Sequence, residues 1–484
     1  MRQSKSTDID LDWHTHTPPP VADDQNFAMI PLFKPLFEYR YAADGQVNWQ
    51  ETNWLKRDGI FSIDLSSGSP HSPEMGSWEQ GRHMVLKEWQ VYFRGSNFPA
   101  GNAPANLIKQ FGNYHEIAWP MAAVPQKPAT DILLALSKFD PKLAELREGS
   151  ARPYSRFPVH YEELPKAMLP HLGLLANACK VLQLRAIAEL DLGKSQEALA
   201  DVRLSFYCAD AVKSESFMVS QLVRARIITE NMQPVWEGLR AHQWTEQNLI
   251  EIQHLLSGFD LLSDYERVLK AEPAFLAGWI GGVPDDPQLF FLLNNGDDSR
   301  KVLLSWLPRG WYYQNELSAA RFFQENTLPD VLPETQRAFP GRTLTNSTLF
   351  DRLPNTQFTF VFRQIGLVSS PQDLIEAQNG VNMARIACGL ERWWMAHGHF
   401  PETLQALVPE YLDTLPHDII NGEPLKYHLK SDGQFILYSV GWNETDDGGI
   451  YPKKGVFPTN GMGDSFKIYR PETGDWVWQY PEGN

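Results

Sequence analysis

An acidic loop near the C-terminus carries the residue types most able to do chemistry. It places an amide and three carboxylates ahead of two glycines: Asn443, Glu444, Asp446, Asp447, Gly448 and Gly449. Ca²⁺ prefers roughly six to eight oxygens from carboxylates, amides and carbonyls on a flexible loop. One loop offers too few, so Asp418 would have to approach from a second segment. We expect such an ion to stabilise the fold; the alternative is a solvated acidic turn.

No familiar catalytic motif accompanies this loop. The chain has no GxSxG elbow, HExxH helix, P-loop or glycine-rich dinucleotide fingerprint after a strand. His14 and His16 form an HxH pair, but they lack a third ligand in a Pro-flanked tail. Glycosidase chemistry stays open, because its two carboxylates leave no local signature. Whether the protein is an enzyme is therefore undecided, and we favour a non-enzymatic role.

Two further side-chain groups each have a functional and a structural interpretation. An aromatic cluster could stack on sugar rings, although packing in a core is the favoured interpretation: Trp306, Trp311, Tyr312 and Tyr313. The three cysteines, Cys179, Cys208 and Cys388, include no CxxC pair. We expect free, buried thiols in preference to a disulfide or a zinc site.

The charge balance disfavours nucleic acid as a partner. Lys+Arg number 43 and Asp+Glu number 59, which gives a net charge of −16, so no basic footprint can release counterions from a phosphate backbone. No run approaches the roughly 18 apolar residues that span a bilayer. Residues 1–25 lack the pattern of a signal peptide, and we expect a disordered leader.

Helical periodicity dominates the middle of the chain. Apolar residues recur at three- and four-residue spacing from Leu172 to Leu190, Gly193 ends that pattern, and Ser195 opens another. These features predict an antiparallel helical hairpin. Its small residues have tetratricopeptide-like spacing, but the pattern does not return about 34 residues later, so we expect one hairpin and not a solenoid.

A long helix over 371–394 is expected to begin the C-terminal module. Gly398 is typical of a helix C-cap and Pro401 forbids continuation. Asp432 and Gly433, between two alternating runs, predict a β-hairpin, and residues 467–480 predict another. The fold class is thus α+β and mainly α-helical, with helical hairpins in the middle and a small antiparallel sheet at the end.

The length of 484 residues exceeds what one core usually serves, which favours several domains. We divide the chain into five segments: a leader (1–25), an irregular α+β region (26–125), a helical domain (126–335), a linker-like segment (336–370) and the C-terminal module (371–484).

The order of parts in 390–449 resembles the C-terminal globular half of type II secretion major pseudopilins. The shared features are an aromatic helix end, a staged set of turns and a strand before the acidic loop, carried by Trp393, Trp394, Gly398, Phe400, Pro401, Tyr411, Leu412, Pro416, Asp418, Asn421, Gly422, Ser439 and Gly441. In that family a loop at this place binds calcium, so the resemblance implies a structural Ca²⁺. The apolar spine of true pseudopilins is absent here, which speaks against assembly into a pseudopilus.

The wider arrangement, from NFAMIPLFKPLFEY through SKFDPKLAELREG and SQLVRARIITENMQPVWEGL to the C-terminal module, resembles large envelope proteins of planctomycete and verrucomicrobial bacteria. That resemblance carries no catalytic residue. It implies an extracytoplasmic location and a membrane anchor upstream. We therefore expect a non-enzymatic envelope protein that contacts other proteins, with a link to secretion machinery. The alternative is an envelope hydrolase or glycan binder with a cleft between the helical and N-terminal regions.

Overall fold

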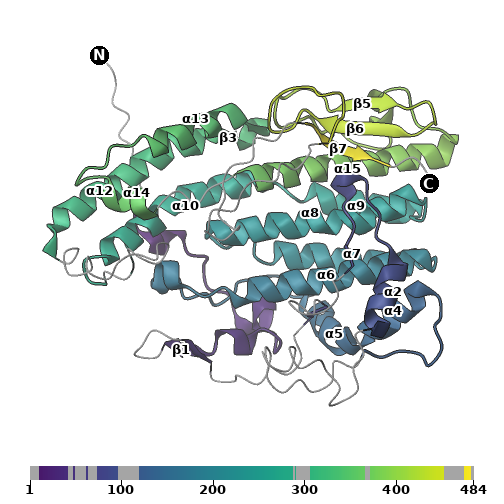
Figure 1. The fold of residues 1–484 in the computed structure, drawn as a ribbon, viewed down its shortest axis with the longest axis horizontal. Coiled ribbons are helices and arrows are strands. Elements are labelled where there is room, and N and C mark those ends of the chain that lie inside the picture. The colour runs from purple at the N-terminus through teal and green to yellow at the C-terminus, as the bar shows by residue number, and fades with distance from the viewer. Residues whose placement is uncertain are drawn as a thin grey trace.

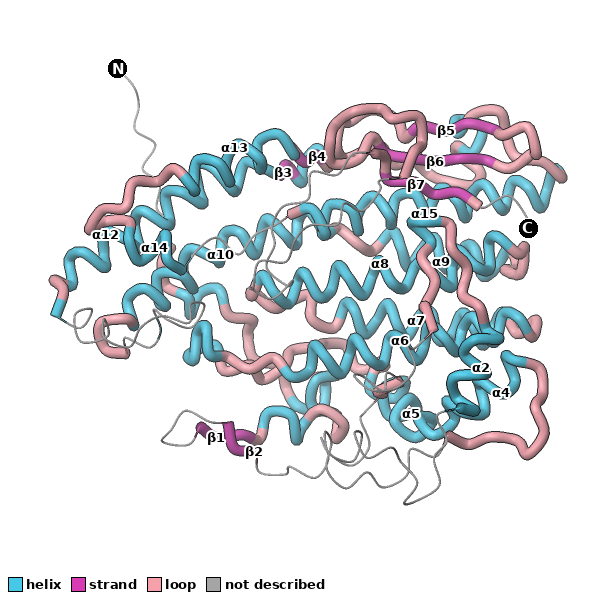
Figure 2. The backbone as a smooth tube through the Cα atoms, in the orientation of Figure 1, coloured by secondary structure: helices cyan, strands magenta, loops and turns pink. Residues whose placement is uncertain are grey.

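Helices make up most of the fold, and all the strands are short and antiparallel (Figure 2). This computed structural model confirms the expected α+β, mainly helical class. It describes residues 10–41, 47–49, 61–63, 73–95, 119–286, 289, 306–365, 371–451 and 474–480.

Long helices lie side by side in the centre of the molecule (Figure 1). They are α6 (Pro170–Asp191), α7 (Ser195–Asp210), α8 (Met218–Arg240), α9 (Glu246–Ser257), α10 (Leu261–Gly282) and α15 (Gln372–His397). Buried side chains from all of them join one hydrophobic core, to which the N-terminal segments and the sheet also contribute. None of the described helices is both long and apolar enough to cross a membrane.

The predicted helical hairpin is confirmed as α6 and α7, which pack on each other. Gly193 takes a φ of +71° in the turn between them, a conformation that suits glycine. Arg185 on α6 donates to Asp201 on α7 at 2.9 Å and fixes the pairing. Cys179 and Cys208 face each other across the hairpin as buried free thiols.

Local signals set the ends of the neighbouring helices. Thr245 and Asn248 form a reciprocal capping box at the start of α9. Gly238 near the end of α8 allows Trp244 to lie against the helix, since a Cβ there would fall 2.1 Å from the indole nitrogen. The indole of Trp244 donates to the carbonyl of Val235 at 3.1 Å, which closes the α8–α9 corner.

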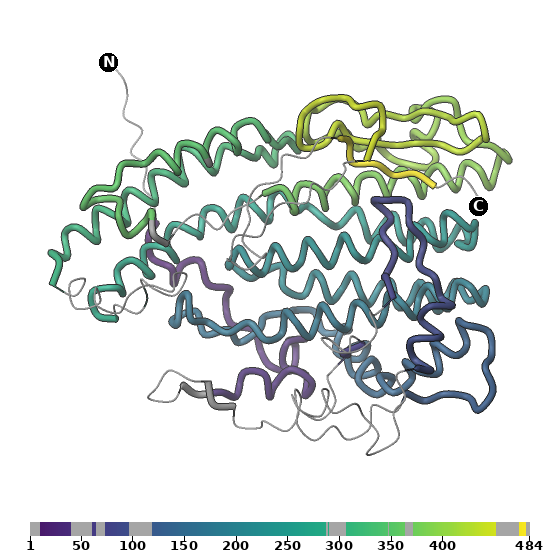
Figure 3. The backbone as a smooth tube through the Cα atoms, in the orientation of Figure 1, coloured from purple at the N-terminus to yellow at the C-terminus, as the bar shows by residue number. Residues whose placement is uncertain are grey.

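Residues before α6 form short elements that cover one side and one end of the bundle (Figure 3). The 3₁₀ helices are η1 (Trp13–His16), η2 (Asp23–Gln25), η3 (Phe27–Met29), η4 (Lys34–Phe37), η5 (Trp78–Gln80), η6 (Ser137–Phe139) and η7 (Tyr161–Lys166). The α-helices and strands are α2 (Leu86–Gly95), α4 (Pro128–Leu136), α5 (Asp140–Gly149), β1 (Tyr39–Tyr41) and β2 (Val47–Trp49). β1 and β2 pair as antiparallel strands, with Tyr39 opposite Trp49.

The described part of the expected leader, residues 10–25, is packed against the body. Trp13 in η1 lies against α10, and the carbonyl of His16 accepts a 2.5 Å hydrogen bond from Ser216. The apolar contact of Trp13 and the hydrogen bond to His16 together fix this short polar segment. The amino-acid composition of the segment predicts neither contact.

Residues 306–365 form a helical arm at one end of the bundle (Figure 1). It contains α12 (Arg309–Phe322), a π-helical turn (Phe323–Thr327), η11 (Leu328–Asp330), β3 (Val331–Leu332), η12 (Pro333–Thr335), β4 (Arg337–Ala338), α13 (Pro340–Asp351) and α14 (Phe360–Ile365). The expected linker over 336–370 therefore contains β4 and two helices. Buried Asp330 in η11 accepts hydrogen bonds from Thr343 and Asn346 in α13, and these bonds join the two helices within the arm.

The aromatic cluster of the arm divides between core and surface. Tyr312 is buried as expected, but the core interpretation is wrong for Trp306 and Tyr313, which are 82% and 59% exposed. These side chains lie on the outer face of the arm, where no other described element covers them.

The C-terminal module follows the predicted order. Gly398, with φ +78°, ends α15, and η13 (Leu404–Leu407) leads to a sheet of β5 (Lys426–Leu429), β6 (Phe435–Ser439) and β7 (Trp476–Gln479) in the order β5-β6-β7. The hairpin at Asp432 and Gly433 is confirmed, with Leu429 opposite Phe435. In the second expected hairpin, β7 pairs with β6, and residues 467–473 lie outside the described residues.

The sheet packs on α15 at one face of the bundle, and η5 contacts its last strand (Figure 3). Trp78 of η5 meets Trp478 of β7, with ring centroids 5.1 Å apart. Trp236 on α8 donates to the carbonyl of Gln479 at 3.1 Å. The module is thus held by residues from both the N-terminal and the central parts of the chain.

Candidate functional site

A charged cluster surrounds the connection between α7 and α8. Its centre is Arg224 on α8, whose side chain is completely buried. The guanidinium donates to Asp264 on α10 at 2.8 Å and to Asp210 at the end of α7 at 2.6 Å. A buried ion pair contributes only when its geometry and hydrogen bonds are good. Here one cation binds two carboxylates and thereby joins three helices.

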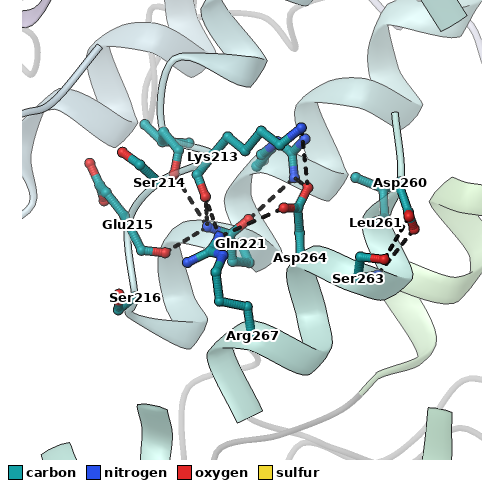
Figure 4. Close-up of polar contacts among 12 residues, drawn as sticks. Lys213, Ser214, Glu215, Ser216, Gln221, Asp260, Leu261, Ser263, Asp264 and Arg267 are labelled. Carbon is teal, nitrogen blue, oxygen red and sulfur yellow. Dashed lines mark hydrogen bonds and ion pairs between the residues drawn. The ribbon is translucent and has the colours of Figure 1, made fainter. Parts of the chain in front are cut away.

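The α7–α8 connection is tied to the same cluster by two side chains (Figure 4). The buried amide of Gln221 donates to the carbonyls of Val212, Lys213 and Glu215 at 3.2, 3.1 and 2.8 Å. Arg267 on α10 donates to the carbonyl of Lys213. Burial lowers the pKa of Arg267, the nearby charge of Arg224 adds to that effect, and Asp264 opposes it.

A buried histidine–carboxylate pair lies beside this connection. The Nε2 of His171 is 2.6 Å from Glu215, and Ser220 donates to the other carboxylate oxygen at 2.5 Å. The ring of Phe157 stacks on His171 with centroids 4.2 Å apart. Ser220 donates to the carboxylate of Glu215 and not to His171, whereas a nucleophilic serine is activated by a hydrogen bond to the histidine. We assign this group a structural role.

A polar pocket of about 380 Å³ opens beside the cluster, where the loop at 153–155 meets α7 and α10. Tyr154, Lys213 and Arg267 line it with the carboxylates of Asp210 and Asp264. Both carboxylates bond to Arg224, so neither is free to act as a general base without breaking an ion pair. The pocket can hold a small polar molecule by hydrogen bonds.

Sequence reasoning missed this cluster. Arg224 lies on the buried side of α8 with Gln221, Ala225 and Ile228, at helical spacing. A charged residue within such a stripe signals a buried ion pair. Its partners, 14 and 40 residues away, carry no signal of their own.

The predicted calcium ligands fall into two places. Asp418 is buried beneath the sheet, where its carboxylate accepts from Ser439 Oγ, Ile420 N and Val440 N, each at 2.9 Å. Asn379 on α15 lies 3.4 Å from the same carboxylate. These bonds join Asp418 to α15 and β6 and use its oxygens within the core.

The other four predicted ligands share the loop after β6. The amide of Asn443 donates to Asp447 at 2.8 Å, while Glu444 takes a φ of +56°. Asp446 accepts from the hydroxyl of Tyr438 at 3.1 Å and lies 3.8 Å from the ammonium of Lys426. The carboxylates of Asp446 and Asp447 are therefore engaged with neighbours from β5, β6 and the loop itself.

Asp475, which sequence reasoning missed, completes the acidic loop. It is buried and accepts from the backbone N–H of Asp447 at 3.2 Å and of Gly449 at 2.6 Å. Burial raises the pKa of Asp475, and the charges of Asp447 and Asp446 raise it further, against those two hydrogen bonds. A cation would relieve this repulsion, so the donor types suit Ca²⁺.

The arrangement of the acidic side chains in this loop suits Ca²⁺ less well than their chemical types do. Among the described residues, no three His, Cys, Asp or Glu side chains converge closely enough to hold a metal ion. A bound ion would require the Asn443 and Lys426 contacts to rearrange. The calcium site stays a prediction.

Searches for similar proteins found no matching family model, no matching curated protein and no matching solved structure. The resemblance of the C-terminal module to pseudopilins therefore rests on the order of its residues.

Proposed function

We propose that this protein is a non-enzymatic component of the cell envelope that acts by binding other proteins, with secretion machinery as the expected setting. One observation supports the protein-binding part: an exposed apolar stripe on the helical arm. The envelope and secretion parts rest on the two resemblances in sequence.

The stripe consists of Trp306, Tyr313 and Leu317, which are 82%, 59% and 37% exposed. Tyr313 and Leu317 are four residues apart on α12 and share one face of that helix, and Trp306 lies just before the helix begins. Aromatic side chains are enriched at protein interfaces, where they often dominate the binding energy. Polar Arg309 and Arg321 on the same helix suit the rim of such an interface.

The rival function, a hydrolase or glycan binder, is supported by the polar pocket of about 380 Å³. The pocket lies near the N-terminal region, as a hydrolase or glycan binder with a cleft there would require, because Tyr154 in its lining forms a β-bridge with Asn26. Against that function, both pocket carboxylates bond to Arg224.

Site-specific photo-crosslinking in the cells that make the protein tests the proposal. A crosslinking amino acid at Leu317 should yield one discrete product with an envelope protein, and Trp306→Asp should abolish it. Because Trp306 is 82% exposed, this change should alter the unfolding free energy by less than about 0.5 kcal/mol.

The matched control is the same amino acid at Val124, which is 73% exposed on another part of the surface. Equal products at both positions, or none at Leu317, would exclude the stripe as an interface. A cytoplasmic partner would contradict the envelope assignment.

A further inference from the structure

An apolar cavity of about 170 Å³ lies between the segment before α6, the start of α8, α10 and the π-helical turn after α12. Its walls are mainly large apolar side chains, among them Leu164, Phe217, Phe275, Leu276, Trp279 and Phe323. An engineered cavity of about 150 Å³ with similar lining binds benzene. This cavity therefore has room for one aromatic ring and a short substituent.

Among the described residues that line the cavity, Glu272 on α10 is the one that can ionise. No hydrogen bond or ion pair joins its carboxyl to another residue in the part of the chain that the structure describes. Burial raises the pKa of Glu272 to about 7. The side chain is partly exposed at the mouth of the cavity, so its carboxyl lies at the boundary between solvent and the apolar lining, where a ligand in the cavity can reach it.

Three departures from regular backbone meet at the same cavity. Leu164 has φ +51° and ψ −120°, a strained conformation for a residue with a side chain. Pro273 follows Glu272 inside α10 and removes one helical hydrogen bond. Phe323 begins the π-helical turn, a feature that is frequent at functional sites. Gly278 lets Leu164 approach α10 closely, because a Cβ there would lie 3.0 Å from the Leu164 side chain.

We propose that this cavity binds a small apolar amine, with its ring or branched chain among the aromatic side chains and its ammonium group hydrogen-bonded to Glu272. Among the described residues, no Lys, Arg or His lines the cavity, so carboxylates and phosphates lack a cationic partner in that lining. An ammonium–carboxylate hydrogen bond is about twice as strong as a neutral one, which favours an amine over an alcohol. The net charge of −16 also draws cations toward the protein. This activity goes beyond the proposed protein binding, which uses a separate surface.

Calorimetry on the full chain with three probes that share a phenylethyl group tests the proposal: 2-phenylethylamine, neutral 2-phenylethanol and anionic 3-phenylpropanoate. We expect the amine to bind at least about tenfold more tightly than the alcohol, and the acid to bind weakest. Glu272→Gln should bring the amine to the affinity of the alcohol. Equal affinities for the three probes, or no saturable binding of the amine up to about 10 mM, would overturn the proposal.

Two variants separate loss of the site from loss of the fold. Glu316→Gln is the matched control, because burial raises the pKa of Glu316 to about 6 although this residue does not line the cavity. It should bind the amine as the wild type does. Leu276→Trp should fill the cavity and abolish binding of both amine and alcohol while the far-UV circular dichroism stays unchanged. Undiminished amine binding to Glu272→Gln or to a folded Leu276→Trp protein would also overturn the proposal.

Discussion

Asp264 and Glu272 lie on the same helix, eight residues apart, in opposite chemical environments. Asp264 is bonded to Arg224 and has Lys213 and Arg267 within 4 Å. Glu272 lies among apolar side chains and has no ionic partner in the described structure. The separation along α10 is about 12 Å, since each residue rises about 1.5 Å.

This difference separates two uses of a carboxylate on one helix. At Asp264 the carboxylate binds Arg224 and helps to fix three helices. At Glu272 the protein supplies a cavity and leaves the hydrogen bonds of the carboxyl unused. The first arrangement is complete within the chain, whereas the second is completed by a ligand. Experiments that remove either arrangement therefore have different expected outcomes.

The largest expected effect is at the first carboxylate. Arg224→Met keeps most of the side-chain volume but leaves Asp264 and Asp210 without their shared cation. We expect a loss of about 3–5 kcal/mol in the free energy of unfolding, measured by urea denaturation. Arg226→Met is the control, because Arg226 lies on the exposed face of α8, and it should cost less than about 1 kcal/mol. Equal losses of unfolding free energy in the two variants would show that the Arg224 ion pairs contribute no more than an exposed one, and the contrast between Asp264 and Glu272 would fail.

A smaller effect, opposite in sign, is expected at the second carboxylate. Burial raises the pKa of Glu272 from 4.5 in the exposed chain to about 7. The folded state therefore binds the proton more tightly, and stability falls as pH rises from about 4.5 to about 7. Glu272→Gln removes this loss, so above pH 7 it should be up to about 3 kcal/mol more stable than the wild type. At pH 4 the two should differ little.

Denaturation of both proteins at pH 4 and pH 8 measures that difference. Glu402→Gln, at an exposed position, should show the same pH dependence as the wild type. If Glu272→Gln behaves like Glu402→Gln, then Glu272 is hydrated or has a partner, and the contrast with Asp264 fails.

The smallest effect concerns Asp475, which lies between the two cases because it accepts two backbone N–H groups while facing Asp446 and Asp447. The predicted Ca²⁺ would relieve the repulsion among these carboxylates. Calorimetric titration should give heat with the wild type and none with the Asp446→Ala, Asp447→Ala double variant. Because saturation at about 100 times the dissociation constant adds about 2.7 kcal/mol, the unfolding midpoint should also rise. Equal heats would exclude the loop.

Local sequence signals predicted the elements whose ends depend on neighbouring residues. Gly398 and the Asp432–Gly433 pair lie where the helix end and the hairpin turn were expected. Thr245 likewise caps α9 through a local side-chain hydrogen bond. These positions are specified by backbone conformation, which depends on residues within one turn.

Contacts across the fold were not predictable in this way. Arg224 and Asp264 are 40 residues apart, and Asp475 meets the loop from beyond the residues on which the calcium set was based. Trp306 and Tyr313 resemble core residues in sequence, yet their exposure depends on which neighbours the arm acquires. The apolar cavity likewise needs four segments together before it exists.

The contact between Trp78 and Trp478 has a consequence for synthesis of the chain. The first tryptophan leaves the ribosome 400 residues before its partner, which at about 5–20 residues per second is an interval of roughly 20–80 s. During that time η5 lacks the strand that it packs against, whereas β6 leaves the ribosome only about 40 residues, or roughly 2–8 s, before β7. The edge of β6 that β7 covers is therefore open only briefly, and the N-terminal part of the chain waits longest for its C-terminal partner.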